Sequence, residues 1–205
     1  MRKIYDIPYR TSAIDDIENR QGKRIVRQER IVGKKVELRP ITDADTQNIV
    51  RWRNSNHVRQ NFIYQTLFTP ESHREWLRDK VGTGLVEQFI IHSKDADIDV
   101  GSVYLRDIDQ THRRAEFGIF IGEESQMGHG IGSECIQLIV RYGFEKLHLH
   151  KVFLRVLADN EIARNAYEKA GFMQEAYLKD EVCIRGEYKD LILMRILNLQ
   201  EGYRG

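Results

Sequence analysis

Two short stretches of this sequence carry residues that could bind an anion and move a proton. The first is Gly128-His129-Gly130-Ile131-Gly132, in which the glycines alternate. Glycines let successive backbone N–H groups turn toward one point, and the apolar-periodic run after Gly130 predicts a helix whose positive end faces that point. This arrangement suits a pyrophosphate. The second stretch, residues 160–172, carries Tyr167, whose hydroxyl could donate a proton.

Two common nucleotide-binding motifs do not fit the glycine stretch. A dinucleotide fold uses Gly-x-Gly-x-x-Gly, but the sixth position counted from Gly128 is Ser133. A P-loop ends in Gly-Lys-Ser/Thr, whereas Gly132 is followed by Ser133 and Glu134. The stretch alone is therefore a weak signal, and the elements around it decide its meaning.

The elements that must position these stretches alternate between strand and helix. β-Branched and aromatic residues at 114–122 predict a strand, and apolar residues at helical spacing between 130 and 146 predict an amphipathic helix. A mostly buried strand is predicted at 152–158 and a second helix at 161–170, which Gly171 closes. The glycine stretch and Tyr167 therefore belong to successive helices.

This segment resembles the core of the GNAT superfamily of acetyl-CoA-dependent N-acetyltransferases. The cofactor loop of that family is written Gln/Arg-x-x-Gly-x-Gly/Ala, and residues 127–132 match it except at Met127. A second hallmark, Asn-x-x-Ala-x-x-x-Tyr-x-Lys-x-Gly-Phe, matches residues 160–172 at every named position. The similarity extends from about Lys35 to Leu197, and it is strongest to the branch with the ribosomal-protein (RimJ and RimL) and amino-sugar acetyltransferases.

The resemblance implies an α/β (α+β) fold and a set of contacts to the cosubstrate acetyl-CoA. The GNAT fold has a mixed, largely antiparallel central sheet of about seven strands, flanked by about four helices, with a V-shaped splay between two central parallel strands. Asn160 is a natural helix N-cap, and the resemblance adds a hydrogen bond to the pantetheine arm. The implied contacts are Phe120, Ile121, Met127, Gly128, His129, Gly130, Ile131, Gly132, Asn160, Arg164 and Lys169.

Acetyl transfer to an amine needs a neutral nucleophile and a proton for the departing thiolate. Tyr167 is the expected acid, the alternative being an aromatic packing residue. Glu116 is the expected general base and substrate contact, because a carboxylate beside apolar walls could take a proton from an ammonium. A structural carboxylate paired to Arg106 or Arg114 is an equal alternative. His57, His73 and His129 are further candidates for the base.

The acceptor amine is less well specified by the sequence. Trp52 and Arg53, in a Trp-Arg-Asn segment typical of this branch, are expected to contact the substrate, with Trp52 stacking on a base or sugar and Arg53 holding a phosphate. A solvated helix face with a buried Trp is the alternative. The leading expectation is acetylation of a nucleotide-linked amino sugar in a ternary complex. The alternatives are N-terminal acetylation of a protein of the ribosomal-protein-alanine type, polyamine acetylation, and an acyl-CoA-binding sensor without activity.

Composition predicts one catalytic domain without a strongly charged partner. The 205 residues are 41% hydrophobic and carry a net charge of +1, so nucleic acid is not expected as a ligand. With two cysteines, no signal peptide and no apolar run of membrane-spanning length, a cytoplasmic protein without membrane contact is expected. Cys135 is expected to be a packing residue, and the spacing of His and Cys predicts no metal site.

Domain organisation is predicted in three parts. Residues 1–34 form an N-terminal extension, which is either a partly ordered tail or an arm that packs on a partner subunit. Residues 35–200 form a single GNAT acetyltransferase domain, and 201–205 a C-terminal tail. The expected partners are a small-molecule or peptide amine and a second copy of the chain in a homodimer.

Overall fold

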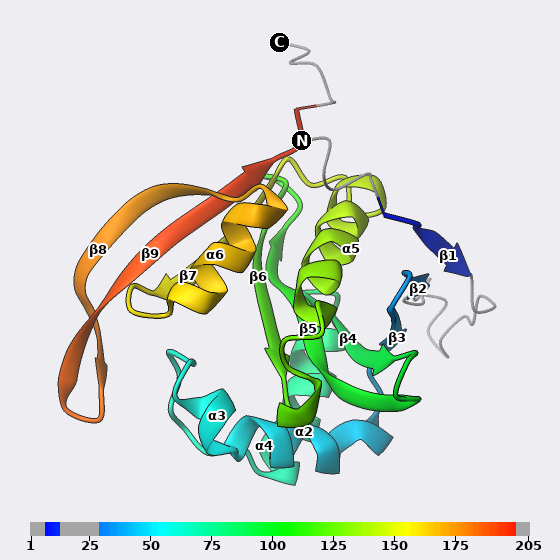
Figure 1. The fold of residues 1–205 in the computed structure, drawn as a ribbon, viewed down its shortest axis with the longest axis horizontal. Coiled ribbons are helices and arrows are strands. Elements are labelled where there is room, and N and C mark those ends of the chain that lie inside the picture. Colours follow the sequence, from blue (N-terminus) through cyan, green and yellow to red (C-terminus); the bar gives the residue numbers. More distant parts are fainter. Residues whose placement is uncertain (1–6, 13–28, 200–205) are drawn as a thin grey trace.

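The structure, a computed structural model, describes residues 7–12 and 29–199. In this part of the chain nine strands form one sheet in the order β1-β2-β3-β4-β5-β6-β7-β9-β8 (Figure 1). The strands are β1 (Arg10–Ser12), β2 (Arg30–Val32), β3 (Val36–Pro40), β4 (Val86–Ser93), β5 (Ile98–Asp109), β6 (Arg114–Ile121), β7 (Lys151–Leu157), β8 (Met173–Ile184) and β9 (Glu187–Leu197).

Five α-helices accompany this sheet within the described residues. They are α2 (Thr46–Asn54), α3 (Asn56–Arg59), α4 (Pro70–Trp76), α5 (Ile131–Glu145) and α6 (Glu161–Ala170). Short helical turns at Asp43–Asp45, Leu77–Val81 and Glu124–Gln126 extend or precede them.

The expected mixed and largely antiparallel sheet is confirmed, with nine strands in place of about seven and five helices in place of about four. The two additional strands are β1 and β2, which come from the segment 1–34 and pair antiparallel beside β3. The fifth helix, α3, is a single turn of four residues. The boundary placed between residues 34 and 35 stays a prediction.

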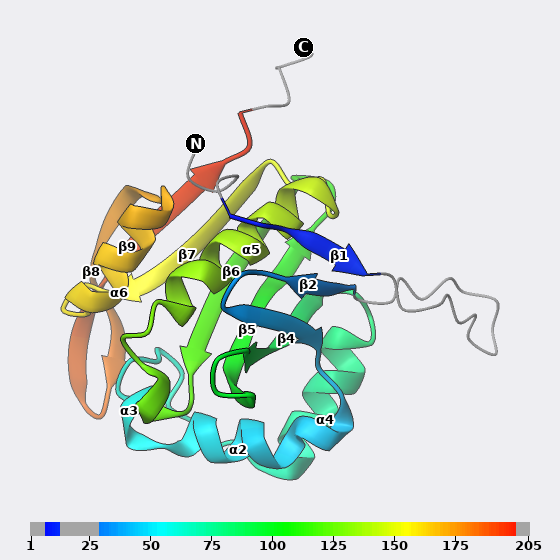
Figure 2. The same cartoon turned by 45° about the vertical axis from the view of Figure 1, so that its right-hand side comes forward.

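Alternation along β4 separates two hydrophobic cores on the two faces of the sheet. Phe89 and Ile91 belong to a large core with α5, whereas Ile90 between them joins a smaller core with Ile49 and Trp52 of α2. Successive side chains of a strand point to opposite faces, so the helices form two layers. Figure 2 shows α5 and α6 grouped apart from α2, α3 and α4. The molecule is thus a sheet with helices on both faces.

The parallel strands β6 and β7 separate soon after they meet. Their pairing covers residues 114–116 of β6 and 151–153 of β7, although β6 continues to Ile121 and β7 to Leu157. The strands therefore leave each other after three residue pairs, which gives the expected V-shaped splay. Figure 1 shows β6 and β7 side by side near the upper edge of the sheet.

Local sequence signals explain several of the element ends. Thr69 and Ser72 form reciprocal side-chain-to-backbone hydrogen bonds at the start of α4, where Pro70 occupies the first helical position. Arg185 and Gly186 both have positive φ and join β8 to β9 in a two-residue hairpin turn. Along its length β8 has two irregularities in register against β9.

No helix among the described residues combines the length and apolar content needed to cross a bilayer. Over the same residues, no cluster of three or more His, Cys, Asp or Glu side chains could hold a metal ion. Cys135 is fully buried on α5 among the residues of the large core, so its expected packing role is confirmed.

Candidate active site

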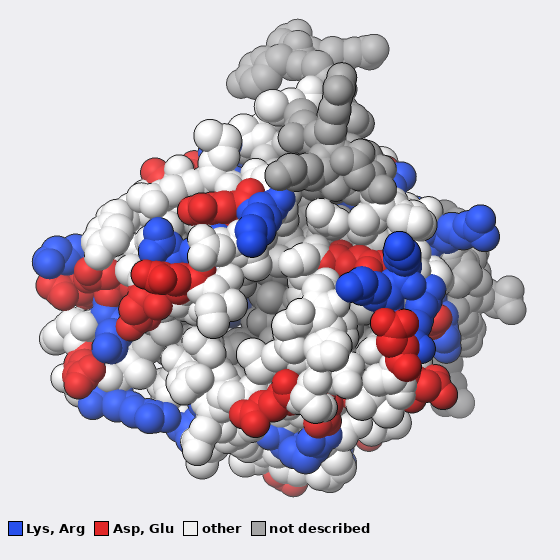
Figure 3. Space-filling model, viewed as in Figure 1, with Lys and Arg blue, Asp and Glu red and all other residues white. Residues whose placement is uncertain are grey.

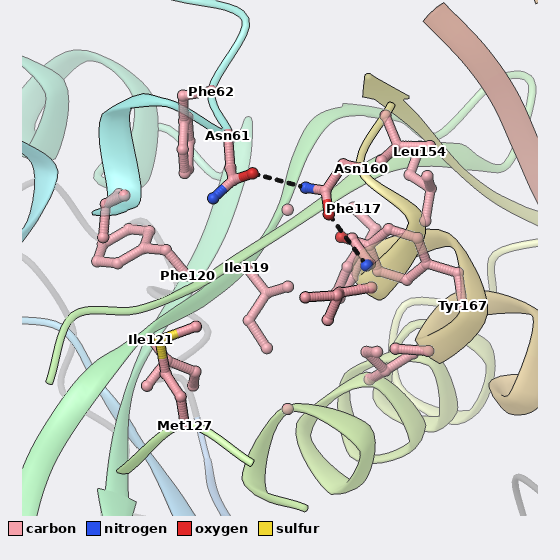
Figure 4. A pocket seen from close by; sticks show the side chains of 18 of the residues that line it. Asn61, Phe62, Phe117, Ile119, Phe120, Ile121, Met127, Leu154, Asn160 and Tyr167 are labelled. Atoms are coloured by element: carbon pink, nitrogen blue, oxygen red, sulfur yellow. Dashed lines mark hydrogen bonds between the residues drawn. The ribbon is translucent and has the colours of Figure 1, made fainter. Parts of the chain in front are cut away.

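A cavity of about 570 Å³ lies where the splay of β6 and β7 meets the starts of α5 and α6. The segment that follows α3 closes its other side. Figure 4 shows the cavity with Tyr167 of α6 on one side, Phe62 on the other, and Ile119 of β6 between them in this view. In Figure 3 the middle of this face, between α5 and α6, carries mainly uncharged side chains, and charged ones lie around it.

The glycine stretch forms one wall of this cavity and needs glycine for its backbone. Gly128 and Gly130 have φ of 82° and 80°, in the left-handed region that other residues rarely adopt. Gly130 is the N-cap of α5, and Gly128, Gly130 and Gly132 all line the cavity. A Cβ at Gly128 or Gly132 would meet no atom within 4 Å, so the space in front of the loop is open. The loop therefore fits a phosphate group at a helix N-terminus.

Charged side chains from outside the loop hold it in place. The Nζ of Lys35 donates a hydrogen bond of 2.8 Å to the carbonyl of His129. The Glu134 carboxylate, in the first turn of α5, accepts hydrogen bonds from the backbone N–H groups of Lys34 and Lys35. The turn between β2 and β3 is thereby fastened to the start of α5, which fixes the shape of the cradle.

The splayed part of β6 forms the floor of the cavity. Residues 117–121 line it and are beyond the last pairing with β7. The ring of Phe120 is buried on the opposite face of the sheet, in T-shaped contact with Phe62 at a centroid distance of 5.9 Å. At Phe120 and Ile121 the groups free for a ligand are those of the backbone, which have no strand partner on the β7 side.

Tyr167 projects from α6 against two phenylalanines of the large core. Its ring lies 5.8 Å from that of Phe117 and 5.9 Å from that of Phe172. No described residue forms a hydrogen bond with its hydroxyl, although the side chain lines the cavity. Burial raises the pKa of Tyr167 well above its usual value, and nearby Tyr104 raises it further. The hydroxyl is therefore protonated and has a free hydrogen to donate.

Asn160 connects α6 to the opposite side of the cavity. Its side-chain oxygen accepts a hydrogen bond of 3.1 Å from the backbone N–H of Ala163, which makes it the N-cap of α6. Its amide nitrogen donates to the side-chain oxygen of Asn61 at 3.0 Å, as the dashed line in Figure 4 shows. Asn160 thus spans the mouth of the cavity, and its capping role is confirmed.

Glu116 lies at the point where β6 and β7 separate and is held by two arginines. Arg106 of β5 approaches its carboxylate to 2.8 Å, and Arg155 of β7 to 3.0 Å. Both carboxylate oxygens accept guanidinium hydrogens, and the side chain is 6% exposed. Of the two partners considered from the sequence, Arg106 is present and Arg114 instead approaches Asp109. This geometry favours the structural alternative, because both carboxylate oxygens already accept hydrogen bonds from arginine side chains.

The two residues expected to hold the acceptor lie outside this cavity. Trp52 is 1% exposed, its indole N–H donates to Glu123 at 2.8 Å, and its ring packs against Phe120. The expected stacking on a ligand is not supported, because a buried ring has no free face. Arg53 is also buried, and its guanidinium lies 3.6 Å from the ring centroid of Phe62 and lines a second cavity.

Three of the expected acetyl-CoA contacts do not line the cavity. Arg164 donates to the carbonyl of Ala158 at 3.0 Å, which stabilises the turn before α6. Lys169 is exposed near the end of α6, and His129 is exposed in the glycine loop. The backbone carbonyl of His129 is nevertheless the group that Lys35 binds.

Sequence patterns did not single out Arg155 or Tyr104, both of which line the cavity. The sequence does contain an indication for Arg155, because it is the one charged residue inside the apolar run 152–158. For Tyr104 the indication is Gly118, a glycine in the middle of the neighbouring strand β6. A Cβ on Gly118 would come within 2.3 Å of the Tyr104 ring, so the glycine lets that ring lie across the neighbouring strand.

Comparisons with known proteins agree with this site. The family model for the acetyltransferase (GNAT) domain matches residues 35–173. The spermidine N(1)-acetyltransferase of Escherichia coli K12 is 33% identical over 165 residues, which cover 80% of this chain and 87% of that protein. The spermidine N(1)-acetyltransferase of Vibrio cholerae is 28% identical over 166 residues, or 81% of this chain and 95% of that protein.

The fold also matches a solved structure with bound ligands. A crystal structure of the Vibrio cholerae spermidine N-acetyltransferase, in complex with CoA and spermine, superposes with a TM-score of 0.74 at 28% identity. The match covers 80% of this chain and 95% of that chain. The expected GNAT fold is thereby confirmed, and with more than half of its residues matched by the domain model, the chain belongs to the GNAT family and is an acetyl-CoA-dependent N-acetyltransferase.

Proposed function

We propose that this enzyme acetylates a primary amine at the cavity between β6, α5 and α6, with Tyr167 as the proton donor. The observation that carries the proposal is that one cavity contains the glycine loop, the unpaired edge of β6 and the Tyr167 hydroxyl. The loop would hold the pyrophosphate, and the strand edge would pair with the amides of the pantetheine arm. These contacts would bring the thioester beside the tyrosine.

The transfer needs a balanced movement of one proton. The neutral amine attacks the thioester carbonyl, the carbon–sulfur bond breaks, and the sulfur takes the proton of the Tyr167 hydroxyl. The acetylated nitrogen loses its proton to water, through which the tyrosine is reprotonated. Because the pKa of Tyr167 is raised, it would not remain as a tyrosinate, and the two proton movements should occur together.

A polyamine of the spermidine class is the first candidate acceptor. The two relatives named above support it, since both are spermidine N(1)-acetyltransferases at 28% and 33% identity over most of their length. They favour a polyamine over the nucleotide-linked amino sugar expected from the sequence patterns. The test is thiol release from acetyl-CoA with spermidine, spermine, glucosamine, a nucleotide-linked amino sugar and an alanine-starting peptide. Activity with spermidine at least tenfold above the other amines would support this acceptor, and activity with none of the amines would support a sensor.

An amine that also carries an anionic group is the second candidate, and the charges of the site favour it. Among the described residues that line the main cavity and its neighbour, Glu116 is the one carboxylate, while Arg53, Arg106 and Arg155 are cations. A polyamine binds through carboxylates or aromatic faces, and an excess of arginine opposes it. The same panel separates the two candidates.

A further inference from the structure

A second cavity of about 280 Å³ opens beside the main one. It lies between α2, α4 and the strands β4 and β5, and its walls are mainly aromatic and aliphatic. The two cavities are continuous in their lining, because both are bounded by Phe62, Tyr64, Tyr104, Arg106 and Phe120. The second cavity is therefore a direct neighbour of the main one.

Arg53 presents an unpaired cation to this second cavity. Its side chain is 7% exposed, and its Nη1 is buried without a hydrogen-bond partner. The guanidinium is held between aromatic rings, 3.6 Å from the centroid of Phe62 and 4.8 Å from that of Phe68. In the described part of the chain no carboxylate forms an ion pair with it. Burying a cation without an anion is costly, so such an arrangement indicates a missing partner.

His73 presents a second unpaired polar atom to the same cavity. It is fully buried, its Nδ1 lies 3.0 Å from the hydroxyl oxygen of Thr46, and its Nε2 has no partner. Burial lowers its pKa, so the ring is neutral at pH 7. When the Thr46 hydroxyl donates to Nδ1, the ring proton is on Nε2 and is available as a donor. The cavity then has two donors without protein acceptors.

Two further polar residues of the cavity, Gln88 and Arg106, already have protein partners. The Gln88 amide accepts from Trp76 at 2.8 Å and donates to Ser102 at 3.0 Å. Arg106 is bound to Glu116. Arg53 and His73 therefore contribute two buried nitrogens without protein partners to this cavity, and Arg53 also contributes a full positive charge.

We propose that this second cavity is a subsite for an anionic group, a carboxylate or a phosphate, carried by the amine acceptor, and that Arg53 is its anchor. The inference rests on the proposed acetyl transfer only for the position of the amine. Binding of the anion is independent of transfer and can be measured without it. The aromatic walls exclude water, which strengthens a charge-assisted hydrogen bond from Arg53.

The test compares amines that differ by one anionic group. Calorimetry with CoA at saturation, so that no turnover occurs, measures dissociation constants for glucosamine and glucosamine 6-phosphate, and for putrescine and ornithine. We expect the anionic member of at least one pair to bind at least tenfold more tightly. The first pair reports on a phosphate and the second on a carboxylate. The subsite would be overturned by equal binding within both pairs. It would also be overturned if glucosamine and putrescine, which lack the anionic group, bound more tightly than their partners.

Variants then identify the anchor. Arg53→Met keeps the apolar stem between the rings and removes the charge, so the preference within the responding pair should fall below about threefold. Arg74→Met is the matched control, because Arg74 lies on α4 next to His73, is half exposed and pairs with Asp43 at the surface. A preference that survives Arg53→Met would overturn the role of Arg53. Should that variant not fold, Arg53→Lys replaces it and should retain a reduced preference.

The outcomes separate this inference from the proposed function. Anion-dependent binding without thiol release would keep the subsite and remove the proposed acceptor. Acetylation of spermidine at a rate that Arg53→Met leaves unchanged, with no preference for the anionic amines, would keep acetyl transfer and overturn the subsite.

Discussion

Tyr167 has a ring that packs partly buried against the large core and a hydroxyl without a hydrogen-bond partner among the described residues, and these two properties can be separated experimentally. Tyr167→Phe retains the contacts with Phe117 and Phe172 and removes the proton donor. We expect kcat to fall by a factor of about 100 to 10,000. The dissociation constant for acetyl-CoA should remain within a few-fold, because the ring is unchanged. Steady-state kinetics under chemistry-limited conditions and calorimetry measure the two quantities.

Tyr177→Phe is the control for this substitution. Tyr177 is exposed on β8 and hydrogen-bonded to Asp190, away from the cavity. Its variant should leave kcat unchanged. Full turnover in Tyr167→Phe would mean that Tyr167 only packs and that water protonates the thiolate.

Arg53 is expected to lower the free energy of unfolding, although it binds the anionic group of the acceptor in the proposed subsite. Burial lowers the pKa of Arg53 to about 10, which reports that its charged form is disfavoured. Replacing a buried charge by a hydrophobic residue of similar volume is often stabilising, so Arg53→Met should raise the free energy of unfolding by about 1 kcal/mol. Urea unfolding at pH 7 measures the change. A loss of more than about 2 kcal/mol would show that the contacts with Phe62 and Phe68 outweigh the burial of the charge.

The start of α5 can be tested at a glycine whose backbone imposes no restriction. Gly130 is unsuitable, because its positive φ would strain any substitution. Gly132 lies inside α5 with open space before its Cβ position. We expect Gly132→Val to weaken acetyl-CoA binding at least tenfold, about 1.4 kcal/mol, because the side chain occupies the cradle. Calorimetry measures the affinity.

Gly132→Ala provides the matched control for the loop. Alanine in a helix is favoured over glycine by roughly 0.5–1 kcal/mol, so this variant should unfold at an equal or higher temperature. Its effect on acetyl-CoA affinity should lie between those of glycine and valine. Unchanged affinity in a folded Gly132→Val protein would remove the cradle from the proposed site.

The cluster of Glu116 with Arg106 and Arg155 joins three strands at the point of the splay. Glu116→Gln removes the charge that both guanidiniums share, and we expect it to lower the free energy of unfolding by about 1–3 kcal/mol. The pH dependence of kcat should keep its shape, since Glu116 is not expected to accept the proton of the amine. Normal stability together with loss of the low-pH limb of the kcat profile, where a general base becomes protonated, would assign Glu116 as the general base.

Sequence patterns predicted the strands and helices of the core better than they predicted which side chains form pairs. The strands and helices around the glycine stretch were predictable because each has a clear period and a capping signal, as at Asn160 and Gly171. Strands β1 and β2 have only three residues each, too few for a period. Of the two arginines around Glu116, Arg106 was one of the partners considered from the sequence. Arg155 was not considered, because the order of the sheet brings it to Glu116 from a distant strand. The sequence also could not predict that Arg53 Nη1 and His73 Nε2 lack hydrogen-bond partners, because this depends on how distant elements pack.

At the scale of the whole molecule, the splay divides the sheet into two blocks. Strands β1 to β6 form one block and β7, β9 and β8 the other, joined at three residue pairs. Acetyl-CoA in the proposed position would bridge the blocks. At a concentration of 100 times its dissociation constant, we expect it to raise the free energy of unfolding by about 2.7 kcal/mol. Thermal unfolding measures the total effect.

Hydrogen exchange locates the same effect along the chain. The added protection should include residues 117–121, which lie beyond the pairing with β7. The inner strand β4 is paired on both sides and should change little. Protection confined to the glycine loop would contradict pairing along the β6 edge.

The irregular register of β8 has a consequence for aggregation. This strand forms one edge of the sheet, and its two register shifts twist and interrupt the row of backbone groups that it presents to solvent. Within the second shift, the exposed residues Lys179, Asp180 and Glu181 add charge to that edge. Bulges and charges are features by which natural sheets resist the addition of a foreign strand. Any dimer that this chain forms is therefore expected to use side-chain surfaces, and not the extension of its sheet at β8.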